Sequence, residues 1–209
     1  TDANLSTVAL DNDVDTIDAN NQAAILSVAQ AALSVELNGG SATAKLAGDG
    51  TDANLTGVSL DSDVATIDLN GQAAVLTADQ GLLTINDTGV GGTHSVLDSV
   101  ANLTGDQGDL SAATSVTVQL AGDGTDANLS TVALDNDVDT IDLNGKSATM
   151  LRSQHGLNII ADSNNDAVTL FDAGATTAKA NVESYILANG TSTLTLSAAG
   201  QSVTTGGAG

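Results

Sequence analysis

The sequence predicts an all-β fold, a parallel β-solenoid (β-helix), on two observations. One twenty-residue segment occurs three times, starting at Thr1, Thr51 and Thr125, and its first and third copies differ only at Ala19 and Leu143. Repetition of this kind is typical of stacked repeat proteins. In addition, short runs of alternating apolar and polar residues recur roughly every nine residues, as expected of strands with one buried and one solvated face.

The spacing of the copies predicts the size of one coil. The interval from Thr51 to Thr125 is longer than the interval from Thr1 to Thr51. If a coil takes roughly 25 residues, the first interval is two coils and the second is three, and a stack tolerates the insertion of a whole coil. The 209 residues are therefore expected to form a single continuous solenoid, 1–209, of about eight coils.

The alternating runs place the expected strands, about three to a coil. The first copy and its extension give 5–11, 14–20, 23–28, 32–37 and 41–46. The second gives 55–61, 64–70, 73–78, 82–87 and, after a looser stretch, 115–120. The third gives 129–135, 138–144, 147–152, 157–162, 167–172, 182–187, 192–197 and 201–205. Helical composition is confined to residues 28–33.

The core is expected to consist of stacked aliphatic side chains. Phe171 and Tyr185 are the only aromatic residues, and the chain has no Pro to interrupt strand pairing. Equivalent residues of the three copies are predicted to stack in register and to be buried on one side of the coil: Val14, Val64 and Val138, with Ile17, Ile67 and Ile141. An Ig-like β-sandwich is the rival fold, but the interval from Thr1 to Thr51 is too short for such a module.

The charge balance points to a cationic partner. The net charge is −22, with only four Lys and Arg residues, so the chain is expected to repel nucleic acid and anionic membranes. Frequent β-branched residues argue against disorder. There is no Cys for a disulfide or thiolate site. No apolar run is long enough to span a membrane.

The densest acidic segment, LDNDVDTID, resembles a row of hard oxygen ligands. Alternate Asp residues of an extended strand point the same way, and Ca²⁺ accepts six to eight such oxygens. A solvated acidic face is the alternative interpretation. The candidates here are Asp11, Asp13, Asp15 and Asp18; Asp61, Asp63 and Asp68; and Asp135, Asp137, Asp139 and Asp142.

The turn AGDGTD is the second candidate Ca²⁺ site. It occurs at 47–52 and 121–126 and would offer Asp49, Asp52, Asp123 and Asp126 as ligands. Its glycines and aspartates resemble the RTX nonapeptide turn, which holds Ca²⁺ at the corners of a parallel β-roll. The turn occurs singly here, however, whereas RTX sites share ligands between tandem copies. A tight corner without metal is the alternative.

No arrangement of residues predicts a catalytic site. His94 and His155 occupy non-equivalent places in the repeat and have no Cys or Ser elbow nearby. Asp pairs are frequent, as in β-helical polysaccharide lyases and hydrolases, but Arg152 is the only Arg and there is no aromatic platform for a sugar. Such a carbohydrate-active enzyme is the alternative to a non-enzymatic protein.

The AGDGTD turns, the segments VDTIDLNG and NVESYILANG, and the bias toward Ala, Thr, Val, Asp and Gly resemble bacterial surface proteins of the type I-secreted class. These are RTX-related S-layer proteins and giant repeat adhesins. The resemblance implies an extracellular, Ca²⁺-stabilised β-solenoid that contributes to a surface layer, fibre or adhesin stalk, with a surface polysaccharide as a further candidate partner. Because neither end of the repeat array carries a cap, we expect copies of the chain, or the remainder of a longer chain, to cover the ends.

Overall fold

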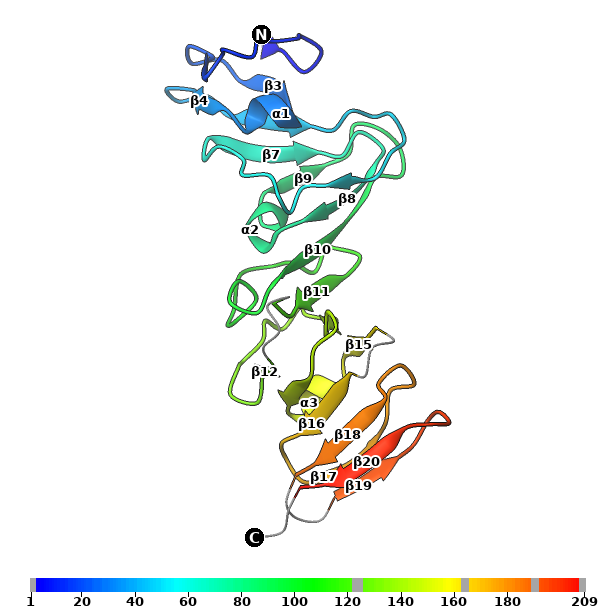
Figure 1. The fold of residues 1–209 in the computed structure, drawn as a ribbon. Coiled ribbons are helices and arrows are strands. Elements are labelled where there is room, and N and C mark those ends of the chain that lie inside the picture. Colours follow the sequence, from blue (N-terminus) through cyan, green and yellow to red (C-terminus); the bar gives the residue numbers. More distant parts are fainter. Residues whose placement is uncertain (1–2, 122–125, 163–165, 189–191, 207–209) are drawn as a thin grey trace. The chain divides into compact units, whose positions relative to one another are not determined.

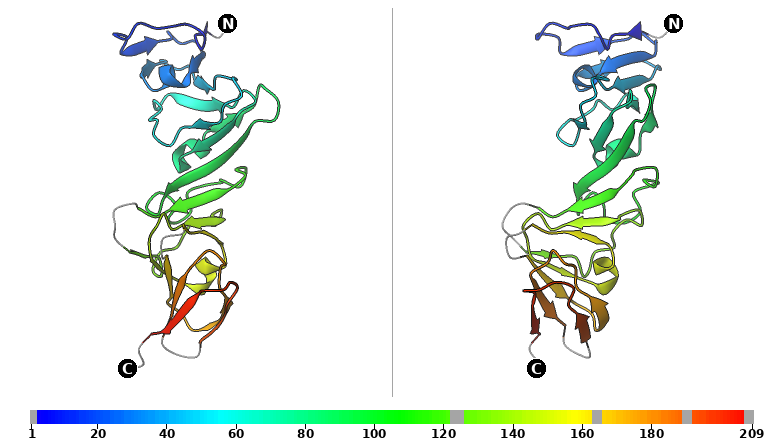
Figure 2. Two further views of the ribbon diagram at one scale, coloured as in Figure 1. Left: turned by 45° about the vertical axis from the view of Figure 1, so that its right-hand side comes forward. Right: turned by 90° about the vertical axis from the view of Figure 1, so that its right-hand side faces the viewer.

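The protein is a parallel β-solenoid, as predicted from the repeats (Figure 1). It has about 11 turns rather than the eight coils expected from the spacing of the copies. A computed structural model describes residues 3–121, 126–162, 166–188 and 192–206. The chain divides into two compact units, each described by itself: unit 1 contains residues 1–97 and 109–114, and unit 2 contains residues 98–108 and 115–209. Every described pairing between named strands is parallel (Figure 2).

Strands of unit 1 lie in three groups. One sheet has the order β1-β3-β5-β7-β9, β2 pairs with β4, and β6, β8 and β10 are neighbours in that order. The elements are β1 (Ala3–Asn4), β2 (Thr16–Asp18), β3 (Ala24–Ser27), α1 (Val28–Ala31), β4 (Ser34–Glu36), β5 (Ala42–Lys45), β6 (Ala53–Asn54), β7 (Val64–Asp68), β8 (Ala73–Leu76), α2 (Ala78–Gly81), β9 (Thr84–Asn86) and β10 (Thr93–Ser99), whose last two residues belong to unit 2.

Unit 2 repeats this plan. Its strands have the orders β11-β13-β15, β12-β14-β16-β18-β20 and β17-β19. The elements are β11 (Val116–Gln119), β12 (Ala127–Asn128), β13 (Thr140–Asp142), β14 (Ala148–Met150), α3 (Arg152–His155), β15 (Asn158–Ile160), β16 (Ala167–Leu170), β17 (Gly174–Thr177), β18 (Ser184–Leu187), β19 (Ser192–Thr195) and β20 (Ser202–Thr205).

The coils are shorter than the spacing of the copies predicts. One coil separates Ala24 from its strand partner Ala42, and another separates Ala44 from its partner Ile67. Successive strands alternate between two sheets, β5, β7 and β9 in one and β6, β8 and β10 in the other. A coil thus has two strand-bearing sides rather than three, because several of the alternating runs form turns or a helical turn.

The three copies are not stacked on one another, contrary to the prediction. Each Ile of the repeated segment pairs with a residue of the next coil rather than with the Ile of another copy: Ile17 with Val35, Ile67 with Ile85 and Ile141 with Ile159. The second copy begins in a different sheet from the first, β6 rather than the sheet of β1. The interval between these two copies is therefore not a whole number of coils.

The core is aliphatic, as expected. The three isoleucines are 0 to 7% exposed, and Val64 and Val138 are buried, while Val14 is half-buried. Columns of paired residues run from strand to strand; one of them joins Ala148, Val168 and Tyr185. Tyr185 is 0% exposed, so one of the two aromatic residues does enter the core.

A buried glutamine joins each helical turn to the preceding coil. Gln80 is the third residue of α2, after the N-cap residue Thr77. The Oε1 atom of Gln80 accepts the Thr77 N–H at 3.0 Å. The Gln80 Nε2 group donates to the carbonyl oxygens of Leu55 and Val58, at 3.1 and 2.7 Å. Gln30 and Gln154 make the same two bonds to their preceding coils, and Gln201 makes a fourth such pair, with the carbonyls of Lys179 and Val182.

Replacing this glutamine is expected to destabilise unit 1. Gln80→Leu removes three hydrogen bonds and leaves the buried Leu55 carbonyl without this donor, which costs about 2 to 3 kcal/mol in the free energy of unfolding. Urea unfolding monitored by circular dichroism measures the loss. Gln22→Leu is the matched control, because Gln22 is exposed. Equal effects of the two substitutions would contradict the role assigned to Gln80.

Candidate functional site

The LDNDVDTID segments begin as turns rather than extended strands. The Oδ1 atoms of Asp11, Asp61 and Asp135 accept the N–H two residues on, at 3.0, 2.9 and 2.9 Å. Their carbonyls accept the N–H of Val14, Val64 and Val138. The predicted row of aligned carboxylates is therefore wrong at these positions, because the short Asp side chain hydrogen-bonds its own backbone and forms a turn.

Other carboxylates of the segment bind backbone amides of the neighbouring coil. Asp63 Oδ2 accepts the Leu37 N–H at 3.3 Å, and Asp139 Oδ2 accepts the Val116 N–H at 3.0 Å. Among the predicted ligands, Asp11, Asp13, Asp15, Asp49, Asp52, Asp63, Asp126 and Asp139 are exposed, Asp61 and Asp137 are half-buried and Asp135 is buried. Asp123 lies outside the described residues.

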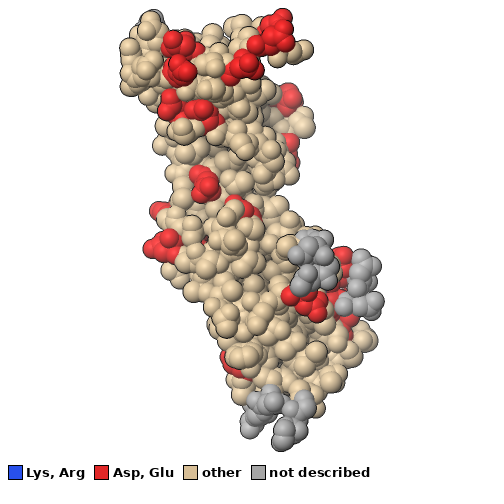
Figure 3. Space-filling view, turned by 60° about the vertical axis from the view of Figure 1, so that its left-hand side comes forward, with Lys and Arg blue, Asp and Glu red and all other residues tan. Residues whose placement is uncertain are grey.

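The predicted ligands that the structure describes are not gathered into a metal centre. On the face shown in Figure 3, Asp and Glu side chains lie in small separate groups. Within the described ranges, no three His, Asp or Glu side chains converge closely enough to hold a metal ion. Ca²⁺ binding accordingly stays a prediction, and turn formation accounts for much of the acidic pattern.

A glutamine organises the first AGDGTD turn. Asp49 Oδ1 accepts the Thr51 N–H at 2.9 Å and Gln72 Nε2 at 2.8 Å, while Gln72 Oε1 accepts the Gly48 N–H at 2.7 Å. The hydrogen bonds, chiefly from the Thr51 backbone, lower the pKa of Asp49. Gly48 and Gly50 have φ of 71° and 79°, which glycine adopts readily. Gln72 thus ties the Asp49 carboxylate to the backbone of the same turn.

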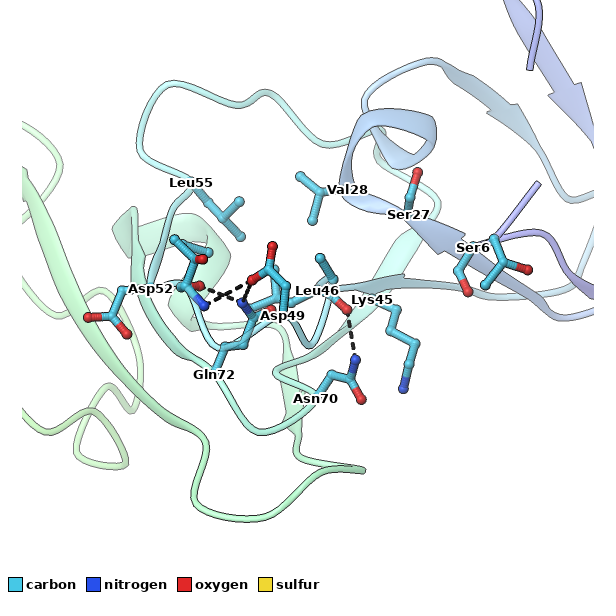
Figure 4. Close-up of a pocket in the computed structure, with 14 residues that line it drawn as sticks. Ser6, Ser27, Val28, Lys45, Leu46, Asp49, Asp52, Leu55, Asn70 and Gln72 are labelled. Carbon is cyan, nitrogen blue, oxygen red and sulfur yellow. Dashed lines mark hydrogen bonds between the residues drawn. The ribbon is translucent and has the colours of Figure 1, made fainter. Parts of the chain in front are cut away.

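A pocket of about 480 Å³ opens beside this turn (Figure 4). Val28, Leu46 and Leu55 supply its apolar lining, and Asp49 and Asp52 supply carboxylates. Asn70 is tied to the wall, since its Nδ2 group donates to the Leu46 carbonyl at 3.0 Å. The pocket can accept a small polar molecule with an apolar side.

Lys45, at the edge of the same pocket, forms a partly buried ion pair. Its Nζ atom lies 2.6 Å from Asp68 Oδ2, and the Thr88 hydroxyl donates to the same oxygen at 2.6 Å. Burial alone would raise the pKa of Asp68, but the hydrogen bonds from Lys45 and Thr88 outweigh it and lower the pKa to about 2. Asp68 is therefore a structural anion at neutral pH rather than a proton donor.

Unit 2 contains a buried carboxylate without such a partner. Asp166 is 1% exposed, and among the described residues neither of its carboxylate oxygens has a hydrogen-bond partner. Burial, followed by the charges of Asp162, Glu183 and Asp142, raises its pKa. The backbone of Asp162 partly offsets these effects. A buried anion among anions is unfavourable unless a proton or a cation neutralises it.

Unit 1 has a lysine beside the aspartate of the repeated segment, and unit 2 has a glutamine at the equivalent position. Lys45 pairs in register with Asp68, as Gln119 does with Asp142. Gln119 Nε2 donates to Asp142 Oδ2 at 2.8 Å, but it brings no charge. Asp68 pairs with Asn86, and Thr88 lies two residues further on. Asp142 pairs with Ile160 in the same way, so Asp162 takes the place of Thr88. A cation in unit 1 is thus replaced by a neutral amide in unit 2.

Sequence reasoning missed the residues that hold the coils together. Gln30, Gln80 and Gln154 are each the thirtieth residue of a copy, so the signal was available beyond the twenty residues of obvious identity. His155 was assigned only as an isolated histidine. It is 1% exposed, and its Nε2 atom lies 3.1 Å from the Tyr185 hydroxyl. Nothing in the local sequence marks this pair, because the two residues meet only across coils.

Comparison of the chain with protein-family models, curated proteins and solved structures finds no match. In the described part of the chain, no helix has the length and apolarity needed to cross a membrane.

Proposed function

We propose that the protein is a structural repeat protein of the bacterial exterior, part of a surface layer, fibre or adhesin stalk, which self-associates and is stabilised by Ca²⁺. The observation that carries the proposal is modular construction. Three copies of one segment each build the same strand, turn and glutamine-linked helical turn. Repetition of a unit that contacts only its neighbours extends a scaffold without requiring a new core.

The charge supports an extracellular role that depends on cations. A net charge of −22 opposes the association of copies unless cations screen or bridge the surfaces. Asp166 and its acidic neighbours also support a role for cations. A divalent cation bound there would offset the repulsion between these carboxylates, which no described side chain relieves.

Electron microscopy of the purified protein in Ca²⁺ and after chelation tests the proposal. We expect ordered arrays or fibres in Ca²⁺ that disperse when the ion is removed. The same images in Mg²⁺ at equal ionic strength separate a specific Ca²⁺ requirement from general screening. Dispersed monomers under all three conditions would overturn the proposed function.

Asp166→Asn is expected to stabilise unit 2 in the absence of divalent cations. The folded-state pKa of Asp166 is raised, so its favourable contribution is complete below the unfolded pKa of 3.8 and is lost as pH rises. The gain in melting temperature over the unmodified chain should therefore grow from pH 4 to pH 8.

Adding Ca²⁺ should then raise the melting temperature of the unmodified protein more than that of Asp166→Asn. Asp11→Asn serves as the control, because Asp11 is exposed and forms a local turn. Its Ca²⁺ response should match that of the unmodified chain. An identical Ca²⁺ response in all three proteins would exclude Asp166 as a cation anchor.

The pocket at the AGDGTD turn favours one other candidate, a β-helical carbohydrate-active enzyme. Two carboxylates, Asp49 and Asp52, line it. A glycosidase needs a general acid with a raised pKa, whereas the pKa of Asp49 is lowered. Turnover of an acidic or neutral polysaccharide that disappears in Asp49→Asn would establish the enzyme instead.

A further inference from the structure

The three copies of the repeated segment share an Asn-Leu-Ser/Thr triplet, at 4–6, 54–56 and 128–130. Asn-X-Ser/Thr is the acceptor pattern of N-linked glycosylation, in which a sugar is joined to the asparagine amide. The pattern alone does not single out these triplets, because it also occurs at 86–88, 102–104 and 189–191. Residues 189–191 lie outside the described residues, so the geometry of five triplets can be compared.

In every copy the hydroxyl of the third residue is bonded to the asparagine. Thr56 Oγ1 donates to Asn54 Oδ1 at 2.8 Å, and the Thr56 N–H donates to the same oxygen at 3.0 Å. Ser6 and Ser130 make the same two bonds to their asparagines. Among the described residues the amide nitrogen, Nδ2, has no hydrogen-bond partner in any copy. The bond to Oδ1 polarises the amide, which makes the Nδ2 protons more acidic.

The asparagine is accessible, whereas the residue after it is anchored to the next coil. The exposed asparagines end the strands β1, β6 and β12: Asn4, Asn54 and Asn128. Leu55 is 4% exposed, and its N–H donates to the Val75 carbonyl at 2.8 Å. Its own carbonyl accepts Gln80 Nε2 at 3.1 Å. A sugar on the neighbouring Asn54 would therefore extend into solvent without displacing the core.

The other two described triplets lack this arrangement. The Thr88 hydroxyl donates to Asp68 Oδ2 at 2.6 Å rather than to its own asparagine. The Thr104 hydroxyl donates to a backbone carbonyl at 2.6 Å, and Asn102 Nδ2 donates to Asp98 Oδ1 at 2.8 Å. The fold thus separates the triplets of the three copies from the other two.

The copies also share an acidic residue two positions before the asparagine. Asp52 and Asp126 are exposed at this position, and Asp2 lies outside the described residues. The other two described triplets have Thr84 and Val100 there. An exposed carboxylate gives a basic enzyme surface a second feature to bind besides the asparagine and the hydroxyl.

We propose that Asn4, Asn54 and Asn128 are N-glycosylation sites, each accepting a sugar from a donor whose anomeric carbon is bonded to a diphosphate. A base of the transferase removes one proton from Nδ2, and the nitrogen–carbon bond forms. The carbon–oxygen bond to the diphosphate breaks, and its electrons leave with the diphosphate. Lipid-linked and nucleotide-linked sugars share this donor chemistry. The inference rests on the proposed exterior location and adds a carbohydrate to each copy of the repeat.

Peptide mass spectrometry of the chain isolated from the cells that produce it tests the inference, because it gives the occupancy of each asparagine. We expect Asn4, Asn54 and Asn128 to be occupied at least about ten-fold more than Asn86 and Asn102. Incubating the unmodified chain with fractions of the same cells distinguishes the donors. Transfer by membranes alone indicates a lipid-linked sugar, and transfer by the soluble fraction with UDP-glucose indicates a nucleotide-linked one.

Substitutions in the second copy test the geometry. Thr56→Val removes the hydroxyl and should lower the occupancy of Asn54 at least about ten-fold, whereas Thr56→Ser keeps the hydroxyl and the sugar. Asp52→Asn should also lower it, because the preceding charge is lost. Asn128 is the control within each variant, since its site is unchanged. Equal occupancy of Asn86 and Asn102, or unmodified asparagines in all three copies, would overturn the inference.

The outcomes separate this modification from the proposed function. Sugar on the asparagines of the three copies supports the inference even if electron microscopy shows no Ca²⁺-dependent arrays. Arrays formed by a chain from its own cells whose asparagines are unmodified would overturn the inference and leave the proposed function intact.

Discussion

Ile141→Asp is expected to abolish the folding of unit 2 around β13. Ile141 is 0% exposed and lies between Val118 and Ile159 in one column of paired residues. The substitution removes a buried aliphatic side chain, worth about 2 to 4 kcal/mol, and places a carboxylate where no cation is available. The sum is comparable to the whole stability of a small domain. Loss of the cooperative thermal transition, followed by circular dichroism, measures the effect.

The neighbouring strand offers a control of the same residue type. Ile160 is 46% exposed and pairs in register with Asp142. Ile160→Asp therefore adds the same charge at the surface, where repulsion from Asp142 is reduced by salt. At 0.15 M salt its cost should stay below about 1 kcal/mol. Similar losses for both variants would mean that Ile141 is not part of a closed core.

The fold class was predictable because the pattern of alternating residues encodes which face is buried. Ile17, Ile67 and Ile141 are buried as expected. The coil length was not predictable from the spacing of copies alone, because that spacing need not be a whole number of coils. The strand pairing reveals it: Ile67 pairs with Ala44 and not with Ile17 of the first copy. The sheet order then shows that the first two copies begin in different sheets.

The candidate site was less predictable, because an Asp-rich segment encodes turns as readily as metal ligands. Asp11 and Asp61 hydrogen-bond the second N–H after them, which is a local preference of the residue. By contrast, Asp68 and Asp166 differ in what reaches them from other coils. Lys45 lies a whole coil before Asp68, and only the strand register places the two side chains together.

A buried hydrogen-bond network around His155 and Tyr185 is expected to make the stability of unit 2 depend on pH. The Tyr185 hydroxyl accepts the Lys179 N–H at 2.7 Å and lies 3.1 Å from His155 Nε2, where the imidazole tautomer sets which of the two groups donates. The Thr176 hydroxyl lies 3.5 Å from His155 Nδ1. The rings of His155 and Tyr185 meet edge to face, with centroids 5.6 Å apart.

The stability of unit 2 should consequently fall as the solution is acidified from pH 6.5 to pH 4. Burial, with the charges of Lys179 and Arg152, lowers the pKa of His155 from 6.5 to about 4. A base whose folded-state pKa is lowered contributes stability that is complete above the unfolded pKa and is lost as pH falls toward the folded one. The loss amounts to about 2 to 3 kcal/mol. Urea unfolding at half-unit intervals of pH measures it.

His155→Gln is expected to flatten this pH dependence, because an amide does not titrate. The two buried carboxyl groups with shifted pKa values, Asp68 and Asp166, change the stability in other ways as the pH falls. Asp68, with a pKa of about 2, loses its contribution only below pH 3.8, and Asp166 gains stability as pH falls. The imidazole resonances report the His155 pKa directly by NMR, with His94 as the second histidine and the variant to assign it. A His155 pKa near 6.5, or an unchanged slope in His155→Gln, would show that the imidazole is not held neutral by the fold.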